Sequence, residues 1–116
     1  MKILVCGGRG YNRRDVIFAT LDNIHSETPI SYLIEGGARG VDQLAYAWAR
    51  ERGLDGKTYP ADWAQHGKAA GPIRNRQMLE SGNPDLVIAF PGGRGTAHMI
   101  GLAKAANVPV KEIVAP

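Results

Sequence analysis

The sequence contains only one cysteine, Cys6, among its 116 residues. A single thiol excludes an internal disulfide framework and is typical of a reducing compartment, so we expect a cytoplasmic protein. No stretch approaches the roughly 20 apolar residues that a membrane-spanning helix needs. The apolar run at residues 3–6 is also too short for the core of a signal peptide. We therefore expect neither a membrane anchor nor a fold held by disulfides.

A strong excess of one charge is missing as well. The 14 basic and 11 acidic residues leave a formal net charge of +3, which by itself is too small to argue for nucleic acid. The apolar content of 44% and the length suit one ordinary globular domain covering 1–116. The position of the basic residues is more informative than their number. Five of them lie in or beside glycine-rich segments: Arg9, Arg39, Lys68, Arg74 and Arg94.

Familiar cofactor and metal motifs are absent too. The sequence has no Walker A motif, and the glycines that begin at Gly7 lack the spacing of the dinucleotide fingerprint. These absences argue against a P-loop ATPase and against ordinary NAD binding. His25 and His66 have no partner at metal-ligand spacing, so we predict no zinc or other metal site and no cofactor.

Short apolar runs alternate with segments of helical periodicity. Strands are predicted at residues 2–6, 32–34, 57–59, 85–90 and 108–113. Helices are predicted from a cap at Asn12 to about 26, from 41 to about 52 with Trp48 on the core face, at 73–79, and from 97 onward. Residues 61–72 show no sustained period, which predicts a partly irregular segment that crosses the surface.

This alternation predicts an α/β fold. We expect a single Rossmann-like, doubly wound, mostly parallel sheet of about five strands with helices on both faces. The strand at 85–90 is the most apolar, so we place it at the centre. In such sheets ligands bind outside the carboxyl ends of the strands, where the strand order reverses.

Three glycine-rich segments each follow a predicted strand and precede a predicted helix. They are Gly7-Gly8-Arg9-Gly10, Gly36-Gly37-Ala38-Arg39-Gly40 and Pro91-Gly92-Gly93-Arg94-Gly95-Thr96. One such loop is as consistent with a plain turn as with a ligand site. Three at equivalent positions, each with an arginine, favour a shared anion or nucleotide site, because glycines let backbone N–H groups approach a phosphate.

Polar residues near these loops each have two interpretations. Asp42 suits ribose hydroxyls, and it equally suits the dipole of the helix that it begins. Glu35 is a candidate base or ribose ligand, and a structural salt bridge explains it as well. Arg74 and Asn75 begin a helix and are placed to hold a phosphate; a solvated first turn is the alternative.

Three further side chains complete the candidate site. Trp63 is a candidate to stack on a base, although an aromatic residue that anchors an irregular loop is the alternative. Lys68 is a candidate basic clamp or a solvated lysine. His98 lies in a first turn, where it is a candidate acid or base. The catalytic residue is not identified by the sequence; the candidates are Arg74, His98 and Glu35.

Four ordered motifs carry a resemblance to a known family. They are Gly7-Gly8-Arg9, then Glu35-Gly36-Gly37-Ala38 with Gly40 and Asp42, then Gly67-Lys68-Ala69-Ala70-Gly71-Pro72 with Arg74-Asn75, and Pro91 to Thr96. On these motifs the chain resembles the SLOG superfamily, and most closely its small stand-alone YspA/YpsA-related branch. The resemblance implies a Rossmann-like fold, a nucleotide or nucleotide-derived ligand and a homo-oligomer.

Relatives in the superfamily differ in function. LOG-type phosphoribohydrolases carry a proline-glycine-glycine-x-glycine-threonine-x-x-glutamate motif and an upstream arginine. The segment 91–96 is similar to the first part of this motif and Arg74 corresponds to the arginine, but Met99 occupies the glutamate position. The departure removes the carboxylate that the family uses at the ribose.

Three functions remain open. The first is a module that binds a nucleotide as a sensor or sequestering protein. The second is a LOG-like hydrolase that cleaves the N-glycosidic bond of a nucleoside monophosphate or an ADP-ribose-like molecule. The third follows from a likeness to the DNA-processing protein of transformation and is single-stranded nucleic acid binding, for which affinity falls steeply with salt.

Overall fold

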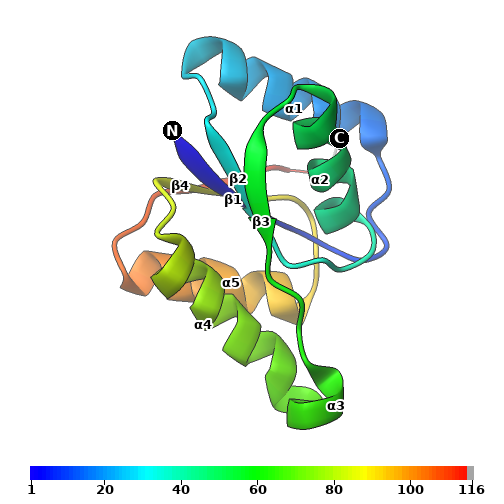
Figure 1. The fold of residues 1–116 in the computed structure, drawn as a ribbon, viewed down its shortest axis with the longest axis vertical. Helices are drawn as coiled ribbons and strands as arrows, with labels where there is room; N and C mark the ends of the chain where they lie inside the picture. Colours follow the sequence, from blue (N-terminus) through cyan, green and yellow to red (C-terminus); the bar gives the residue numbers. More distant parts are fainter. Residues whose placement is uncertain (115–116) are drawn as a thin grey trace.

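The computed structural model describes residues 1–114 and contains one five-stranded sheet between two pairs of helices (Figure 1). The strands are β1 (Lys2–Cys6), β2 (Tyr32–Glu35), β3 (Asp55–Thr58), β4 (Leu86–Ala89) and β5 (Val110–Glu112). The helices are α1 (Arg14–Glu27), α2 (Val41–Glu51), α3 (Trp63–His66), α4 (Ala70–Gly82) and α5 (Arg94–Ala105), with a short 3-10 turn η1 (Gly67–Ala69) before α4. Every strand pairing is parallel, which confirms the predicted α/β fold.

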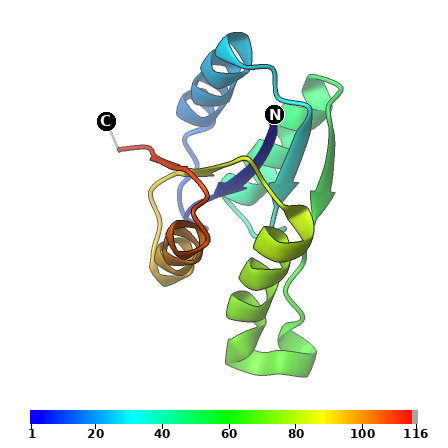
Figure 2. The same ribbon diagram turned by 90° about the vertical axis from the view of Figure 1, so that its left-hand side faces the viewer.

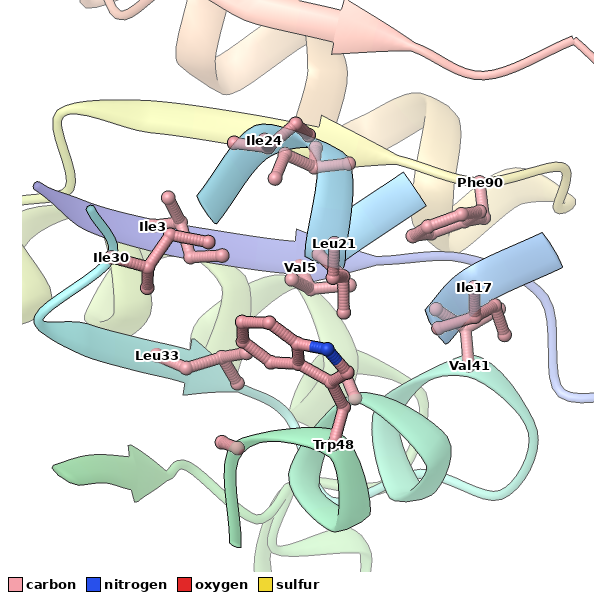
Figure 3. Packing of buried hydrophobic residues seen from close by; sticks show 13 residues of the cluster. Ile3, Val5, Ile17, Leu21, Ile24, Ile30, Leu33, Val41, Trp48 and Phe90 are labelled. Atoms are coloured by element: carbon pink, nitrogen blue, oxygen red, sulfur yellow. The ribbon is translucent and has the colours of Figure 1, made fainter. Parts of the chain in front are cut away.

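Two apolar cores hold the helices on the sheet. Helices α1 and α2 cover one face, and α4 and α5 cover the other (Figures 1 and 2). In the first core Trp48 is fully buried against the sheet, as predicted, among residues such as Val5 and Leu33 (Figure 3). Its indole Nε1–H donates to Asp22 Oδ1 of α1 at 2.9 Å, which satisfies the polar atom of a buried ring.

The strand order is β3-β2-β1-β4-β5, so β1 is the middle strand. The sequence-based placement of the fourth strand at the centre was wrong, since β4 lies one position away, between β1 and β5. After β3 the chain returns on the other side of β1. The order therefore reverses between β1 and β4, and the carboxyl ends of these two strands flank the expected ligand crevice.

Residues 61–72, predicted to be partly irregular, are helical from Trp63 onward. Asp62 caps α3, because its Oδ1 accepts a hydrogen bond from the Gln65 N–H at 3.0 Å. Helix α4 begins at Ala70 instead of at 73 and ends at Gly82. Pro72 is its third residue, a position where the missing N–H removes no helical hydrogen bond.

The last helix also begins earlier than predicted. It starts at Arg94 instead of at 97, so the third glycine loop continues directly into the first turn of α5. The predicted cap of α1 was wrong as well. Arg13 occupies that position without a side-chain hydrogen bond, and the Asn12 side chain donates instead to the Gly10 carbonyl at 3.4 Å.

The third strand begins two residues before the predicted 57–59 segment, because Asp55 already pairs with Tyr32 of β2.

Within residues 1–114, no helix is long and apolar enough to cross a membrane.

Candidate functional site

A cavity of about 620 Å³ opens at the carboxyl ends of β1 and β4, where the strand order reverses. Its volume lies within the range of about 300–1,000 Å³ that is usual for small-molecule sites. All three glycine loops contribute, together with the segment from α3 to α4. The lining residues are Cys6, Gly7, Gly8, Arg9, Ala38, Asp42, Trp63, Lys68, Gly71, Pro72, Arg74, Asn75, Met78, Gly93, Arg94, Gly95, Thr96 and His98.

The remaining predicted site residues lie outside this lining. They are Glu35, Gly36, Gly37, Gly40, Pro91 and Gly92, which belong to the second and third loops or directly precede them. Four lining residues were not among the predicted site residues: Cys6, Gly71, Pro72 and Met78. Gly71 and Pro72 belong to a motif that carries the family resemblance, whereas sequence reasoning missed Cys6 and Met78 altogether. Both are buried core residues, and the only available signal was that Cys6 is the last residue of a strand that runs into a glycine loop.

The first loop joins the other two. The Gly8 N–H donates to the Pro91 carbonyl at 2.9 Å, and the Gly8 carbonyl accepts from the Val41 N–H at 3.3 Å. Gly40 has φ +74°, and a Cβ there would lie 2.5 Å from the Gly8 carbonyl oxygen. The close approach of loops one and two therefore requires glycine at position 40.

Residues from the first turns of α4 and α5 line the cavity. Helix α5 begins without a side-chain cap at Gly93, so its first N–H groups are free to bind an anion. Helix α4 continues from η1, where the Ala70 N–H donates to the Gly67 carbonyl, and Pro72 has no N–H, so α4 contributes mainly the positive end of its dipole. The start of α2 differs, because the carboxylate of Asp42 already occupies its first turn.

Arg74 extends from the second turn of α4 into the same cavity. Its Nη1 donates to the Gly36 carbonyl at 2.5 Å and its Nε donates to Asn75 Oδ1 at 3.2 Å. Burial lowers its pKa, and the negative charge of Asp42 opposes that shift. Within residues 1–114 no acceptor is bonded to Nη2. The half-buried guanidinium is therefore positioned by protein contacts and is not the solvated side chain of the alternative interpretation.

Asn75 connects α4 with α5. The side chain is 5% exposed, and its Nδ2 donates to the Gly95 carbonyl at 3.3 Å. The same nitrogen lies 3.1 Å from His98 Nδ1. Because an amide nitrogen is a donor, His98 Nδ1 is assigned as the acceptor, which places the proton of the neutral ring on Nε2. Together Asn75 and His98 hold the first turn of α5 against α4.

Asp42, in the first turn of α2, adds a negatively charged group to the cavity lining. It is 7% exposed, lines the cavity, and its Oδ2 accepts the Ala38 N–H at 3.2 Å. Burial raises its pKa to about 6, and the nearby negative charge of Glu35 adds to this shift. A carboxylate accepts hydrogen bonds from hydroxyl groups, so it can hold a sugar diol.

Glu35 braces the second loop. It is 2% exposed, its Oε1 accepts the Gly37 N–H at 2.6 Å, and its Oε2 accepts the Thr58 hydroxyl. Burial raises its pKa, and the Thr58 and Gly37 hydrogen bonds oppose the shift. Glu35 lines a separate cavity of about 210 Å³ beside β3, so its position gives no support to a role as base or ribose ligand.

Met99 is fully buried in the core between the sheet and α5, together with Leu4 and Val87. The position that holds glutamate in the LOG-type motif is therefore a core position in this chain.

Burial raises the pKa of the Cys6 thiol to about 12, so at neutral pH this lining residue is a neutral thiol. In the described part of the chain, residues 1–114, no group of three or more His, Cys, Asp or Glu side chains is arranged to hold a metal ion.

Trp63 and Arg9 lie at the outer part of the cavity. Trp63 is 49% exposed, and the Arg9 guanidinium lies 5.3 Å from the centroid of its ring. Lys68, in η1, is exposed and also lines the cavity. The exposed half of the Trp63 ring is available to a ligand, and the other half is covered by protein.

A family model described as the YspA, cpYpsA-related SLOG family matches residues 1–66 of the chain. The chain belongs to this family. The matched segment of the SLOG chain includes the first two glycine loops and Trp63. The chain is also 37% identical over 117 aligned positions to the Gene 61 protein of Mycobacterium phage D29, with 94% of this chain and 93% of the phage protein covered. Membership in the SLOG family points to binding or processing of a nucleotide-related ligand.

Proposed function

We propose that this SLOG chain binds a nucleotide or nucleotide-derived ligand and acts as a sensor or sequestering module. The phosphate is held by the first turns of α4 and α5 and by the guanidinium of Arg74. The observation that carries the proposal is the convergence on a single cavity of the uncapped N-terminus of α5, the first turn of α4 and the protein-positioned arginine Arg74. The N–H groups of α5 and the guanidinium donate hydrogen bonds to a phosphate, and both helix dipoles favour its negative charge.

Asp42 gives the ligand its orientation. Its negative charge at the start of α2 repels a phosphate but accepts hydrogen bonds from ribose hydroxyls. The phosphate therefore lies toward α4 and α5 and the ribose toward α2. Family membership supports the nucleotide class, and the fold supports the location, because ligands of such sheets bind where strand order reverses.

The test compares adenosine 5′-monophosphate (AMP) with adenosine by calorimetric titration of the wild type and of Arg74→Ala. Charged hydrogen bonds contribute about 1.5–3 kcal/mol, so AMP affinity should fall by about 10- to 150-fold. Adenosine affinity should change little. Arg76→Ala is the matched control, because Arg76 is an exposed arginine on the same helix that does not line the cavity. Equal losses for AMP and adenosine would contradict the assigned role.

Hydrolysis of the N-glycosidic bond is the second candidate. Asp42 favours it, since a cavity carboxylate with a pKa of about 6 can exchange a proton near neutral pH. In this reaction water adds to the ribose C1′, and the base leaves with a proton. Chromatography of AMP incubated with the protein tests the idea: free adenine that disappears in Asp42→Asn supports it, and tight binding without free adenine excludes it.

A further inference from the structure

We infer that Arg9 and Trp63 form the base subsite of this cavity, a sandwich that accepts a purine ring between a guanidinium and an indole. The inference rests on the proposed nucleotide function and names the part of the ligand that the phosphate and ribose contacts leave undefined. Trp63 is the only Phe, Tyr or Trp among the cavity-lining residues described within 1–114. The indole is 49% exposed on the cavity wall, and the Arg9 guanidinium is the cation that lies over its ring.

The fold holds the indole by its edge and leaves a face available. Trp63 is the first residue of α3, which Asp62 caps through the Gln65 N–H. A Cβ at Gly71 of α4 would be in ordinary van der Waals contact with Trp63 Cη2, at 3.4 Å, so the edge of the ring lies beside the first turn of α4. A ring fixed in this way is preorganised for stacking and loses little freedom when a base arrives.

Arg9 supplies the opposite face of the sandwich. It lies in the exposed turn after β1, and none of the ion pairs formed within residues 1–114 involves it. Its guanidinium is 5.3 Å from the Trp63 ring centroid, which is a cation–π distance. A flat ring inserted between two planes needs about 7 Å, twice the contact distance of about 3.5 Å. A shift of about 2 Å, within reach of rotations of the exposed Arg9 side chain, opens that space.

The chemistry of these two groups selects the ligand. Indole and guanidinium planes both stack on nucleobases, and a sugar phosphate without a base offers them nothing to stack on. A purine covers more of the indole than a single pyrimidine ring does. The subsite therefore favours purine nucleotides over pyrimidine nucleotides, and both over ribose 5-phosphate.

Tryptophan fluorescence can report on this subsite. Trp63 is exposed in the cavity, whereas Trp48 is fully buried in the core between the sheet and helices α1 and α2. AMP, cytidine 5′-monophosphate and ribose 5-phosphate are titrated into the wild type, Trp63→Leu and Trp63→Phe while tryptophan emission is recorded. Binding itself is measured by calorimetry. Unchanged far-UV circular dichroism and Trp48 emission establish that Trp63→Leu is folded, and Trp63→Phe keeps a stacking ring.

We expect AMP to change the emission of the wild type and to leave that of Trp63→Leu unchanged. Stacking on one base contributes about 1–3 kcal/mol, so the AMP affinity of Trp63→Leu should fall by about 5- to 150-fold while ribose 5-phosphate affinity stays the same. Trp63→Phe should keep most of the affinity. Tyr46→Leu is the matched control, since Tyr46 is an equally exposed aromatic residue outside this cavity.

Arg9→Lys separates the plane of the guanidinium from its charge. We expect this variant to lose affinity for AMP and to keep its affinity for ribose 5-phosphate. Equal losses for both ligands would assign Arg9 to the phosphate and overturn the sandwich. Wild-type AMP affinity in Trp63→Leu would also overturn it while leaving the phosphate site intact. If the wild type binds none of the three probes, the proposed function itself is wrong.

Discussion

Asp42 lies where two electrostatic effects oppose each other. The dipole of α2 favours a negative charge in its first turn, whereas loss of water disfavours it. Burial dominates and raises the folded-state pKa to about 6, above the ordinary value of about 3.9. Between these two values the folded chain holds a proton that the unfolded chain has released. The free energy of unfolding therefore decreases as the pH rises from about 4 to about 6.

Asp42→Asn should remove this penalty. At pH 7.5 we expect the variant to be more stable than the wild type by about 1–3 kcal/mol, since each pKa unit corresponds to about 1.4 kcal/mol. At pH 4 the difference should almost vanish, because the wild-type carboxyl is then protonated in the folded state. Urea unfolding at both pH values measures the effect. A stability difference of the same size at pH 4 and pH 7.5 would show that the carboxyl charge is not its cause.

The same variant should bind nucleotides more weakly, so position 42 is where stability and binding oppose each other. An amide accepts fewer hydrogen bonds from a sugar diol than a carboxylate does. A charged group retained in a buried position against its own desolvation is typical of binding sites.

At the scale of elements, strands and long helices were predictable because burial repeats regularly along them. The apolar run of β1 and the spacing of Val41, Ala45 and Trp48 in α2 each mark one buried face. The segment 61–72 was not predictable from breaker residues. Gly67 is the first residue of η1, directly after α3, with φ +54°. Pro72 lies in the first turn of α4, so both residues occupy positions that helices tolerate.

The glycine loops behave as one element, which a pair of substitutions can test. Gly40→Ala forces an alanine into φ +74° and places its Cβ against the Gly8 carbonyl. We expect a loss of about 2 kcal/mol or more in unfolding free energy, together with weaker nucleotide binding as loops one and two separate. Gly10→Ala is the control in the same region, because a Cβ at that position meets nothing within 4 Å. Comparable stability of the two variants would contradict this account.

At the scale of the whole molecule, the meeting of the three loops was predictable, because parallel strands bring their carboxyl ends to one edge of the sheet. The individual contacts were not. Arg74 is positioned by its hydrogen bond to the Gly36 carbonyl, 38 residues earlier in the sequence. No local sequence pattern predicts a hydrogen bond between residues so far apart. Glu35 belongs to the second loop in sequence, yet its carboxylate turns toward Thr58 of the neighbouring strand. Side-chain direction at a strand end depends on a register that the sequence pattern leaves open.

The prediction that residues 1–116 form one domain has a thermodynamic test. Strand β1 pairs with β2 from the first half of the chain and with β4 from the second half, so neither half keeps its sheet alone. We expect one cooperative transition, with Trp48 emission and far-UV circular dichroism giving the same midpoint in urea. AMP at 100 times its dissociation constant should add about 2.7 kcal/mol to the unfolding free energy. Two separated transitions would indicate two folding units.

The central position of β1 also has a consequence for biosynthesis. Ile3 of β1 pairs with Leu86 of β4, which is synthesised 83 positions later. At about 5–20 residues per second, one edge of the most buried strand waits about 4–17 s for its neighbour. During that interval the nascent chain presents an apolar, unpaired strand edge, which is a template for aggregation. Slower translation of the codons between β1 and β4 should therefore lower the yield of folded protein.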